Sequence, residues 1–186
     1  MFQNKIIHRF LLLLGSVFLF SACSSIPEGA TAVQSFDKAR YLGTWYEIAR
    51  FDVRFERDLN NTTATYSLNE DGTIKVVNQG FNCKKNEWEK ATGKAKFVGA
   101  DDVARLKVSF FGPFYGGYNV VALDDDYQYA LIAGGNLDYL WILSRKTTIP
   151  EDIKAAYLKK AKEIGYDTDA LLWVEHDRVN DALSGN

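Results

Sequence analysis

The sequence predicts an all-β domain, with antiparallel strands forming either a sandwich or a closed barrel, and one α-helix near its C-terminal end. The first observation is a series of eight short segments in which apolar and polar residues alternate, separated by turn residues at near-regular spacing. The second is the glycine-rich stretch FFGPFYGGYNVVAL, which permits a sharp corner and favours a barrel over a flat sandwich. The third is a single stretch of helical periodicity that begins at Pro150.

Residues 1–22 have the layout of a secretory signal peptide. Lys5 and Arg9 precede an apolar run over residues 10–20, and the small residues Ser21 and Ala22 follow it. The run is too short to span a bilayer as a helix, which makes an uncleaved membrane anchor the weaker alternative. We therefore expect the mature chain to begin at residue 23.

The stretch LFSACSS resembles the lipobox of bacterial lipoproteins, with Phe20 where leucine is usual. The resemblance implies that Cys23 carries acyl chains, and two or more such chains give stable membrane anchoring. A disulfide between Cys23 and Cys83 is the alternative, which lipidation would exclude. Ser24 after the lipidated cysteine implies, by the same lipoprotein analogy, that the protein faces the periplasm from the outer membrane.

The charge balance limits the partners of the mature chain. The sequence of 186 residues suggests one domain, and without the signal peptide it keeps 20 basic against 24 acidic residues, a net charge of −4. This scattered, mildly acidic charge does not suit nucleic-acid binding. It would not draw the protein to anionic lipid either, so we expect the acyl chains to hold it at the membrane.

The mature chain divides into a tether and one domain. Residues 23–35 are small and polar after the lipidated cysteine, and they predict a flexible tether that reaches at most roughly 40 Å. Residues 36–186 form the domain. We expect its strands near 44–51, 62–68, 73–80, 88–98, 104–111, 117–123, 128–134 and 139–145. The apolar residues 170–176 add a ninth strand or lie along the outside.

One helix is expected from Pro150, which suits a first-turn position, to just before Gly165. Its apolar side chains share one face, so we expect it to pack against the outside of the β-domain by that face alone.

Alternation along the strands predicts which side chains point inward. Trp45 and Glu47 share one side of the first strand, and the other inward positions are Thr62, Ala64, Tyr66, Ile74, Val76, Asn78, Leu106, Val108, Phe110, Tyr118, Val120, Ala122, Ala130, Ile132, Tyr139, Trp141 and Leu143. Several of these are polar, and a packed interior would leave their polar atoms without partners. A barrel of eight strands is wide enough to hold one small ligand, so we expect a ligand cavity rather than a filled core.

These residues match the lipocalin family, and the sequence is most similar to the bacterial outer-membrane lipocalins, with apolipoprotein D a more distant likeness. The first motif is G-x-W at Gly43 and Trp45, the second corresponds to residues 124–129, and the third is Arg145. The resemblance implies an eight-stranded up-and-down barrel, closed at one end, with Arg145 lying across Trp45 there. Such a contact between a guanidinium and an indole contributes about 0.5–2 kcal/mol.

The resemblance also implies a membrane-anchored lipid-binding protein that stores or transports fatty acids or lysophospholipids. The apolar inward side chains suit an acyl chain, and the polar ones can orient its head. The expected ligand contacts are Tyr66, Asn78, Val108, Phe110, Tyr118, Ile132, Tyr139 and Trp141.

No enzyme activity, metal site or cofactor is expected. Apart from His8 in the signal peptide, His176 is the one histidine that could serve a catalytic triad, and no Cys-x-x-Cys or phosphate-binding glycine pattern occurs. The alternatives are a thiol-dependent lipid isomerase using Cys83, or a passive or partner-binding envelope barrel. The helix and the apolar residues after Gly165 could also form the face of a homodimer.

Overall fold

The structure is a computed structural model that describes residues 26–179. The signal peptide and Cys23 therefore lie outside the described residues. The elements in chain order are α1 (Lys38–Tyr41), β1 (Gly43–Arg50), β2 (Leu59–Leu68), β3 (Ile74–Asn82), β4 (Glu87–Phe97), β5 (Arg105–Ser109), β6 (Gly116–Leu123), β7 (Tyr129–Ala133), β8 (Leu140–Ser144), α2 (Glu151–Ile164), the 3₁₀ helix η1 (Thr168–Ala170) and β9 (Leu172–Trp173).

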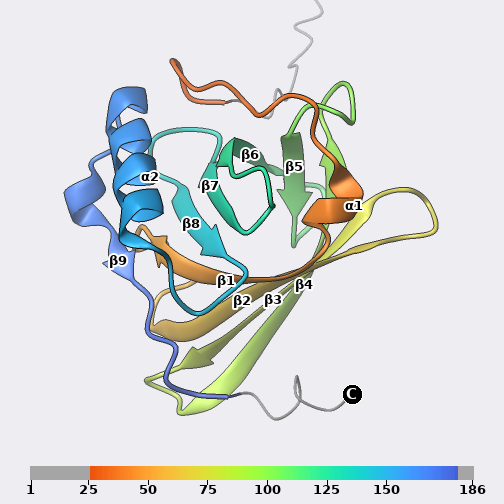
Figure 1. The fold of residues 1–186 in the computed structure, drawn as a ribbon. Coiled ribbons are helices and arrows are strands. Elements are labelled where there is room, and N and C mark those ends of the chain that lie inside the picture. Colours follow the sequence, from red (N-terminus) through yellow and green to blue (C-terminus); the bar gives the residue numbers. More distant parts are fainter. Residues whose placement is uncertain (1–25, 180–186) are drawn as a thin grey trace, which may run out of the picture.

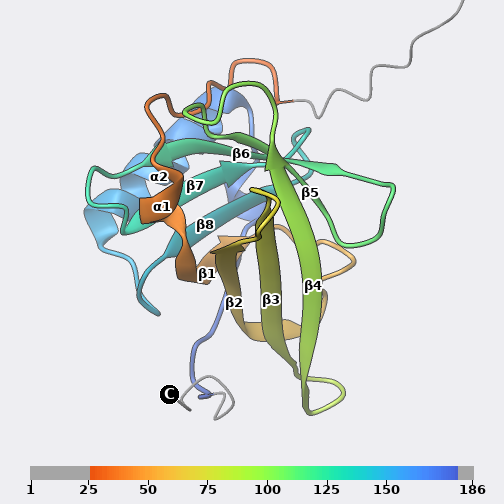
Figure 2. The ribbon, with the colours of Figure 1, turned by 90° about the vertical axis from the view of Figure 1, so that its right-hand side faces the viewer.

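Strand β1 closes the sheet into a barrel. Consecutive strands from β2 to β8 pair antiparallel, and β1 pairs with both ends of this series. The short β9 adds to β1 at Ala49 and Arg50, beyond the part of β1 that pairs with β2. Figures 1 and 2 show the barrel from two directions, with α2 against its outer wall. The predicted eight-stranded antiparallel barrel with a C-terminal helix outside is confirmed.

Two apolar layers stabilise this arrangement. One lies inside the barrel and includes Trp45 and Val120, and the other lies between α2 and the outer faces of the strands. Helix α2 contributes Tyr157 and Ala161 to the second layer, as its one-sided pattern predicts. It ends where Gly165 adopts a φ of 112°, a left-handed conformation that favours glycine.

Two β-bulges shift the inward and outward pattern. The bulge between Val120 and Ala122 places Ala122 in the layer under α2, so the prediction that Ala122 faces inward is wrong. A second bulge, between Glu47 and Ala49, changes the side to which the following residues of β1 point. Since a bulge adds one residue to one strand, it breaks the period of two on which the prediction depends.

The segment 26–35 packs on the barrel instead of serving as a free tether. Ala32 is buried, the amide of Val33 donates to the carbonyl of Val120, and the amide of Ala104 donates back to the carbonyl of Val33. The predicted reach of roughly 40 Å therefore does not apply. Between Cys23 and Ile26 the chain can span at most about 11 Å.

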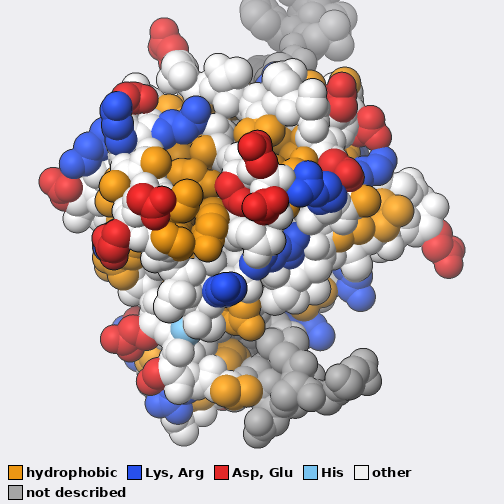
Figure 3. All heavy atoms as spheres, in the orientation of Figure 1, with side chains coloured by type: hydrophobic (Ala, Val, Ile, Leu, Met, Phe, Trp, Pro, Cys, Tyr) orange, Lys and Arg blue, Asp and Glu red, His pale blue; other side chains and the backbone are white. Residues whose placement is uncertain are grey.

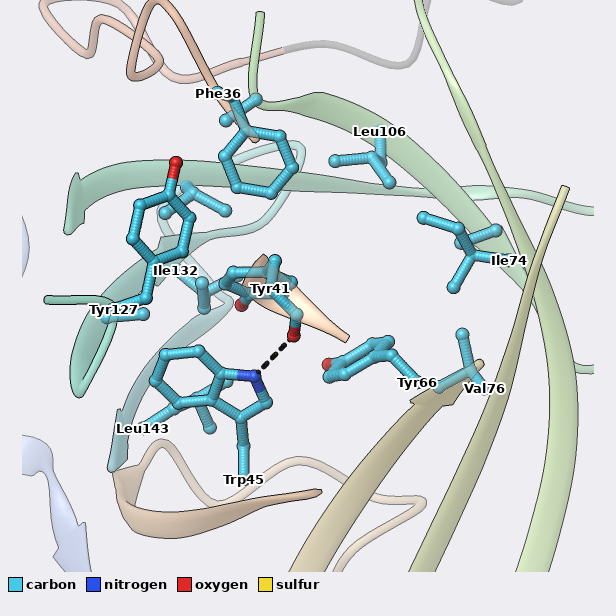
Figure 4. Close-up of a cluster of buried hydrophobic side chains, with 14 residues drawn as sticks. Phe36, Tyr41, Trp45, Tyr66, Ile74, Val76, Leu106, Tyr127, Ile132 and Leu143 are labelled. Atoms are coloured by element: carbon cyan, nitrogen blue, oxygen red, sulfur yellow. Dashed lines mark hydrogen bonds between the residues drawn. The ribbon is translucent and has the colours of Figure 1, made fainter. Parts of the chain in front are cut away.

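Helix α1 and the loops beside it close one end of the barrel. Trp45 is fully buried, and its indole N–H donates to the carbonyl of Tyr41 at 2.9 Å (Figure 4). The Arg145 guanidinium lies 3.9 Å from the centre of the Trp45 ring and donates to the carbonyls of Thr44 and Tyr41. Gly43, with a φ of 94°, brings the backbone close to Arg145. This is the arrangement that the resemblance implies for the three motif residues.

The turn between β6 and β7 also belongs to the closed end. Its residue Tyr127 has a positive φ of 58°, its carbonyl accepts from the Nε of Arg145, and its hydroxyl accepts from the amide of Asp37. The second sequence motif therefore stands next to the first and third.

Candidate functional site: a cavity inside the barrel

A cavity of about 780 Å³ occupies the barrel interior. Its volume lies within the range of roughly 300–1,000 Å³ that is usual for small-molecule sites. The loops β1–β2, β5–β6 and β7–β8 contribute to its lining, and in an up-and-down barrel these three loops stand at one end, away from Trp45. The cavity therefore runs from the closed end towards these loops, which form its mouth.

The cavity lining includes most of the residues that alternation selected. Seven of the eight expected ligand contacts line it, namely Tyr66, Asn78, Val108, Phe110, Tyr118, Tyr139 and Trp141. Ile132 differs, because it is fully buried in the inner apolar layer and does not reach the cavity.

At the deep end, three tyrosine hydroxyls satisfy one another. The Tyr118 hydroxyl lies 2.6 Å from that of Tyr41 and 2.8 Å from that of Tyr66. Burial raises the pKa of all three phenols above their ordinary value, so they stay neutral. The surrounding walls are apolar and include Ile74 and Val76 (Figure 4). This end therefore suits hydrocarbon better than a charged group.

Further along the cavity, the side-chain oxygen of Asn78 on β3 and the hydroxyl of Ser109 on β5 have no hydrogen-bond partner within the described part of the chain. A buried polar atom without a partner is costly, and a polar group of a ligand can provide one.

Near the mouth, the side chains of Glu47 and Glu56 line the cavity, and Arg50 lies against both of them in a charged cluster. The Arg50 Nε lies 2.8 Å from a carboxylate oxygen of Glu47 and 3.9 Å from one of Glu56. The closer contact is an ion pair rather than an aligned hydrogen bond, since the N–H does not point along it. All three side chains are at least 90% buried. Glu56 also accepts a hydrogen bond of 3.0 Å from the indole N–H of Trp141.

The cluster contains two carboxyl groups and one guanidinium. Burial raises the pKa of Glu47, as does the neighbouring carboxyl of Glu56, while Arg50 opposes the shift. Burial also raises the pKa of Glu56. With both carboxyls ionised the cluster carries one excess negative charge, so it favours either a proton or a cationic group beside Glu56.

Arg50 also holds the mouth loop in place. Its guanidinium donates to the backbone carbonyls of Phe51, Glu56 and Leu59, which span the connection between β1 and β2. The loop in turn brings Phe55 over Tyr139, whose ring stacks on Trp141. This series of three rings forms one wall from the mouth inward.

The sequence signals Arg50 and Glu56 only weakly. Residues three apart on a regular strand point to opposite faces, so Glu47 and Arg50 do not pair by alternation. The bulge after Glu47 turns Arg50 inward, and the β1–β2 loop carries Glu56 back over the opening. Neither event follows from periodicity alone.

The residues considered for catalysis lie elsewhere. Cys83 is exposed on the turn after β3 and does not line the cavity. His176 lies on the outside of β1, where its Nε2 is 2.8 Å from the carbonyl oxygen of Glu47 and its ring packs at right angles to that of Tyr46.

Within residues 26–179, no three His, Cys, Asp or Glu side chains are grouped as metal ligands would be. None of the helices in residues 26–179 has both the length and the hydropathy of a membrane-spanning helix.

The comparisons with known proteins agree with this geometry. Residues 36–176 match the family model of the lipocalin-like domain. The chain is 56% identical over 162 residues to the outer membrane lipoprotein Blc of Citrobacter freundii, covering 86% of this chain and 92% of that protein. It is 34% identical over 153 residues to apolipoprotein D of Cavia porcellus, covering 78% and 77%. The chain therefore belongs to the lipocalin family.

A solved structure shows the same fold. Insecticyanin from the tobacco hornworm Manduca sexta superposes with a TM-score of 0.65 at 18% identity, covering 81% of this chain and 86% of that one. Relatives that match most of the chain are named outer membrane lipoproteins. The predicted membership in the bacterial branch is therefore confirmed. The predicted location at the outer membrane, by a lipid anchor, is confirmed as well. Cys23 as the modified residue stays a prediction.

Proposed function

We propose that this lipocalin binds fatty acids or lysophospholipids in the cell envelope and stores or transports them, held to the membrane by a lipid on Cys23. The observation that carries the proposal is the cavity of about 780 Å³ in the barrel, with an apolar deep end and a mouth rimmed by loops. Lipocalins are mainly binding and transport proteins, and a hydrocarbon chain is the ligand that such an apolar, enclosed space favours.

The distribution of apolar and polar side chains along the cavity favours one orientation of the ligand. Ile74, Val76 and Val108 offer apolar walls at depth, where the tyrosine hydroxyls already pair with one another. The charged cluster and Tyr139 stand at the mouth. The acyl chain then enters tail first, with its polar head beside Trp141 and Glu56, and Asn78 and Ser109 provide polar contacts in between.

The charge of the cluster favours one class of head group. A free fatty acid would bring a second excess negative charge next to Glu56, whereas the amine of a zwitterionic lysophospholipid would compensate the first. Aromatic faces next to a carboxylate suit an ammonium group for the same electrostatic reason. We therefore propose lysophosphatidylethanolamine as the better ligand and oleic acid as the weaker one.

Mass spectrometry of organic extracts from the purified protein tests the proposal. We expect repeated recovery of a defined acyl lipid, and displacement of it by added lysophosphatidylethanolamine at a lower concentration than by oleic acid. The Glu56→Gln variant should narrow this difference, because it removes the excess charge without removing the cavity. A barrel that is recovered empty and stays indifferent to both lipids would instead identify a passive envelope protein.

A further inference from the structure

The loop between β5 and β6 exposes apolar side chains at the mouth of the cavity. Phe111 is 80% exposed and Phe114 is 78% exposed, and both belong to the stretch FFGPFY. Phe55 on the β1–β2 loop, 61% exposed, stands at the same end of the barrel. Figure 2 shows the β5–β6 loop extending from the side of the barrel opposite α1. Adjacent aromatic residues this exposed indicate a contact surface.

Two lysines without acidic partners lie beside this loop. Lys96 on β4 and Lys107 on β5 are direct cross-strand neighbours, a placement that is unfavourable for like charges. Neither ammonium lies within ion-pairing distance of a carboxylate among residues 26–179. The Tyr115 ring lies 5.0 Å from the Lys96 nitrogen and 5.3 Å from the Lys107 nitrogen. Phosphate groups of a lipid surface would supply the missing negative charge.

We propose that this loop and these lysines, Phe111, Phe114, Tyr115, Lys96 and Lys107, form a surface that docks the mouth of the cavity onto an anionic phospholipid bilayer. Exposed aromatics enter the boundary between head groups and acyl chains, and lysines next to them bind the head groups. The net charge of −4 does not prevent this, because charges more than about 8 Å away are largely screened at physiological salt.

Membrane anchoring makes such a surface effective even when its own affinity is weak. Because residues 26–35 pack on the barrel, a lipid on Cys23 would hold the protein within about 11 Å of chain from the bilayer. The second contact is then an intramolecular one, with a high effective concentration. The anchor provides proximity, and the loop provides orientation, so that a lipid can pass between bilayer and cavity without crossing water.

Co-sedimentation with vesicles tests the surface without the anchor. The mature chain carrying Cys23→Ser is mixed with vesicles of phosphatidylethanolamine and phosphatidylglycerol at 3:1. We expect it to bind, and the double variant Phe111→Ser/Phe114→Ser to bind at least about tenfold more weakly, since each phenylalanine loses its apolar contact. Leu68→Ser is the matched control, because Leu68 is 53% exposed on β2 next to the β2–β3 turn, at the other end of the strands.

Two further variants separate the parts of the surface. Lys96→Gln/Lys107→Gln should weaken binding to these vesicles, by about fivefold per lysine, and leave the weaker binding to phosphatidylcholine unchanged. Phe114→Trp should keep the binding and give a new tryptophan emission that brominated phospholipids quench. Failure of the Cys23→Ser chain to bind, equal binding by the phenylalanine variant, or no quenching of Trp at position 114 would each overturn the proposal.

Vesicle binding tests the docking surface independently of the proposed lipid binding. Only the role of this surface in lipid transfer rests on the proposed function. Vesicle binding needs no ligand in the cavity. A chain that binds vesicles through the loop but yields no acyl lipid on extraction would keep the docking surface and refute the carrier. The reverse result would refute the surface alone.

Discussion

At the scale of single residues, the buried cluster of Glu47, Arg50 and Glu56 has one carboxyl too many. Removing one carboxyl group should not lower the free energy of unfolding. Removing both carboxyl groups should leave the buried guanidinium of Arg50 without a counter-charge. We expect Glu56→Gln to leave the free energy of unfolding at pH 8 unchanged or raise it by about 1 kcal/mol. The double variant Glu47→Gln/Glu56→Gln should lose about 3–5 kcal/mol, as urea denaturation would measure. If Glu56→Gln lowered the free energy of unfolding as much as the double variant does, Glu56 would not be a surplus carboxyl.

The same cluster should make stability depend on pH. Because the pKa of Glu47 and of Glu56 is raised in the folded protein, the folded state binds more protons than the unfolded chain above about pH 4.3. The stabilising contribution is complete below that pH and is lost as pH rises through the raised pKa values. The stability of the wild type relative to Glu56→Gln should therefore increase as pH falls. If the difference in the free energy of unfolding between the two proteins stayed constant with pH, the pKa values of Glu47 and Glu56 would not be raised by folding.

Trp45 and Arg145 form the floor of the barrel, so their effect should be structural. Trp45→Ala removes a fully buried indole and should lower the free energy of unfolding by about 3–5 kcal/mol. Trp173, which is 43% exposed on β9, is the matched control, and Trp173→Ala should cost much less. Thermal and urea unfolding would measure both. An unchanged midpoint for Trp45→Ala would contradict its place in the floor.

At the scale of elements, the strands and α2 could be predicted because alternation, turn residues and helix end signals agreed along the chain. The bulges could not, since their cause lies in the pairing between strands. Alternation therefore puts Ala122 on the wrong face. It also gives no sign of Glu56, which the β1–β2 loop brings to the cavity. The sequence pattern does not predict helix α1 either, because four residues are too few to show a helical period.

The contact between β4 and β5 gives a prediction at this scale. A Cβ at Gly93 would lie 2.7 Å from the Ser109 carbonyl oxygen and 2.8 Å from the Phe110 ring. Gly93→Ala should therefore push Phe110 from its place in the cavity wall and destabilise the protein, by about 1–3 kcal/mol. Gly116→Ala, where a Cβ meets nothing within 4 Å, is the control. Equal melting temperatures for the two variants would show that β4 and β5 accommodate the added methyl group at Gly93 without loss of stability.

At the scale of the whole molecule, the anchor and the barrel have separate tasks. Cys23→Ser should release the protein from the membrane fraction into the soluble periplasmic fraction, because the acyl chains supply most of the binding energy. Fractionation at high salt, which weakens the contact of Lys96 and Lys107 with lipid, would remove the remainder held by the docking surface. Full retention of the variant at high salt would show that Cys23 is not the anchor.

The charges of the molecule agree with this division. On the face shown in Figure 3, acidic and basic side chains are interspersed, so this face carries no large field of one sign. The sequence could predict this balance from composition. It could not predict that two unpaired lysines meet beside an aromatic loop, because their proximity depends on the register of β4 and β5.

The proposed lipid binding requires that the interior of the barrel holds a hydrocarbon chain. A titration of the Cys23→Ser chain with a brominated fatty acid, read by tryptophan emission, tests it directly. Of the four tryptophans, Trp141 lines the cavity, and Trp45, Trp88 and Trp173 do not. We predict saturable quenching at one ligand per chain, most of which disappears in Trp141→Phe while the protein still binds the ligand. Emission that falls only in proportion to added lipid, or that is quenched equally in the variant, would contradict the claim.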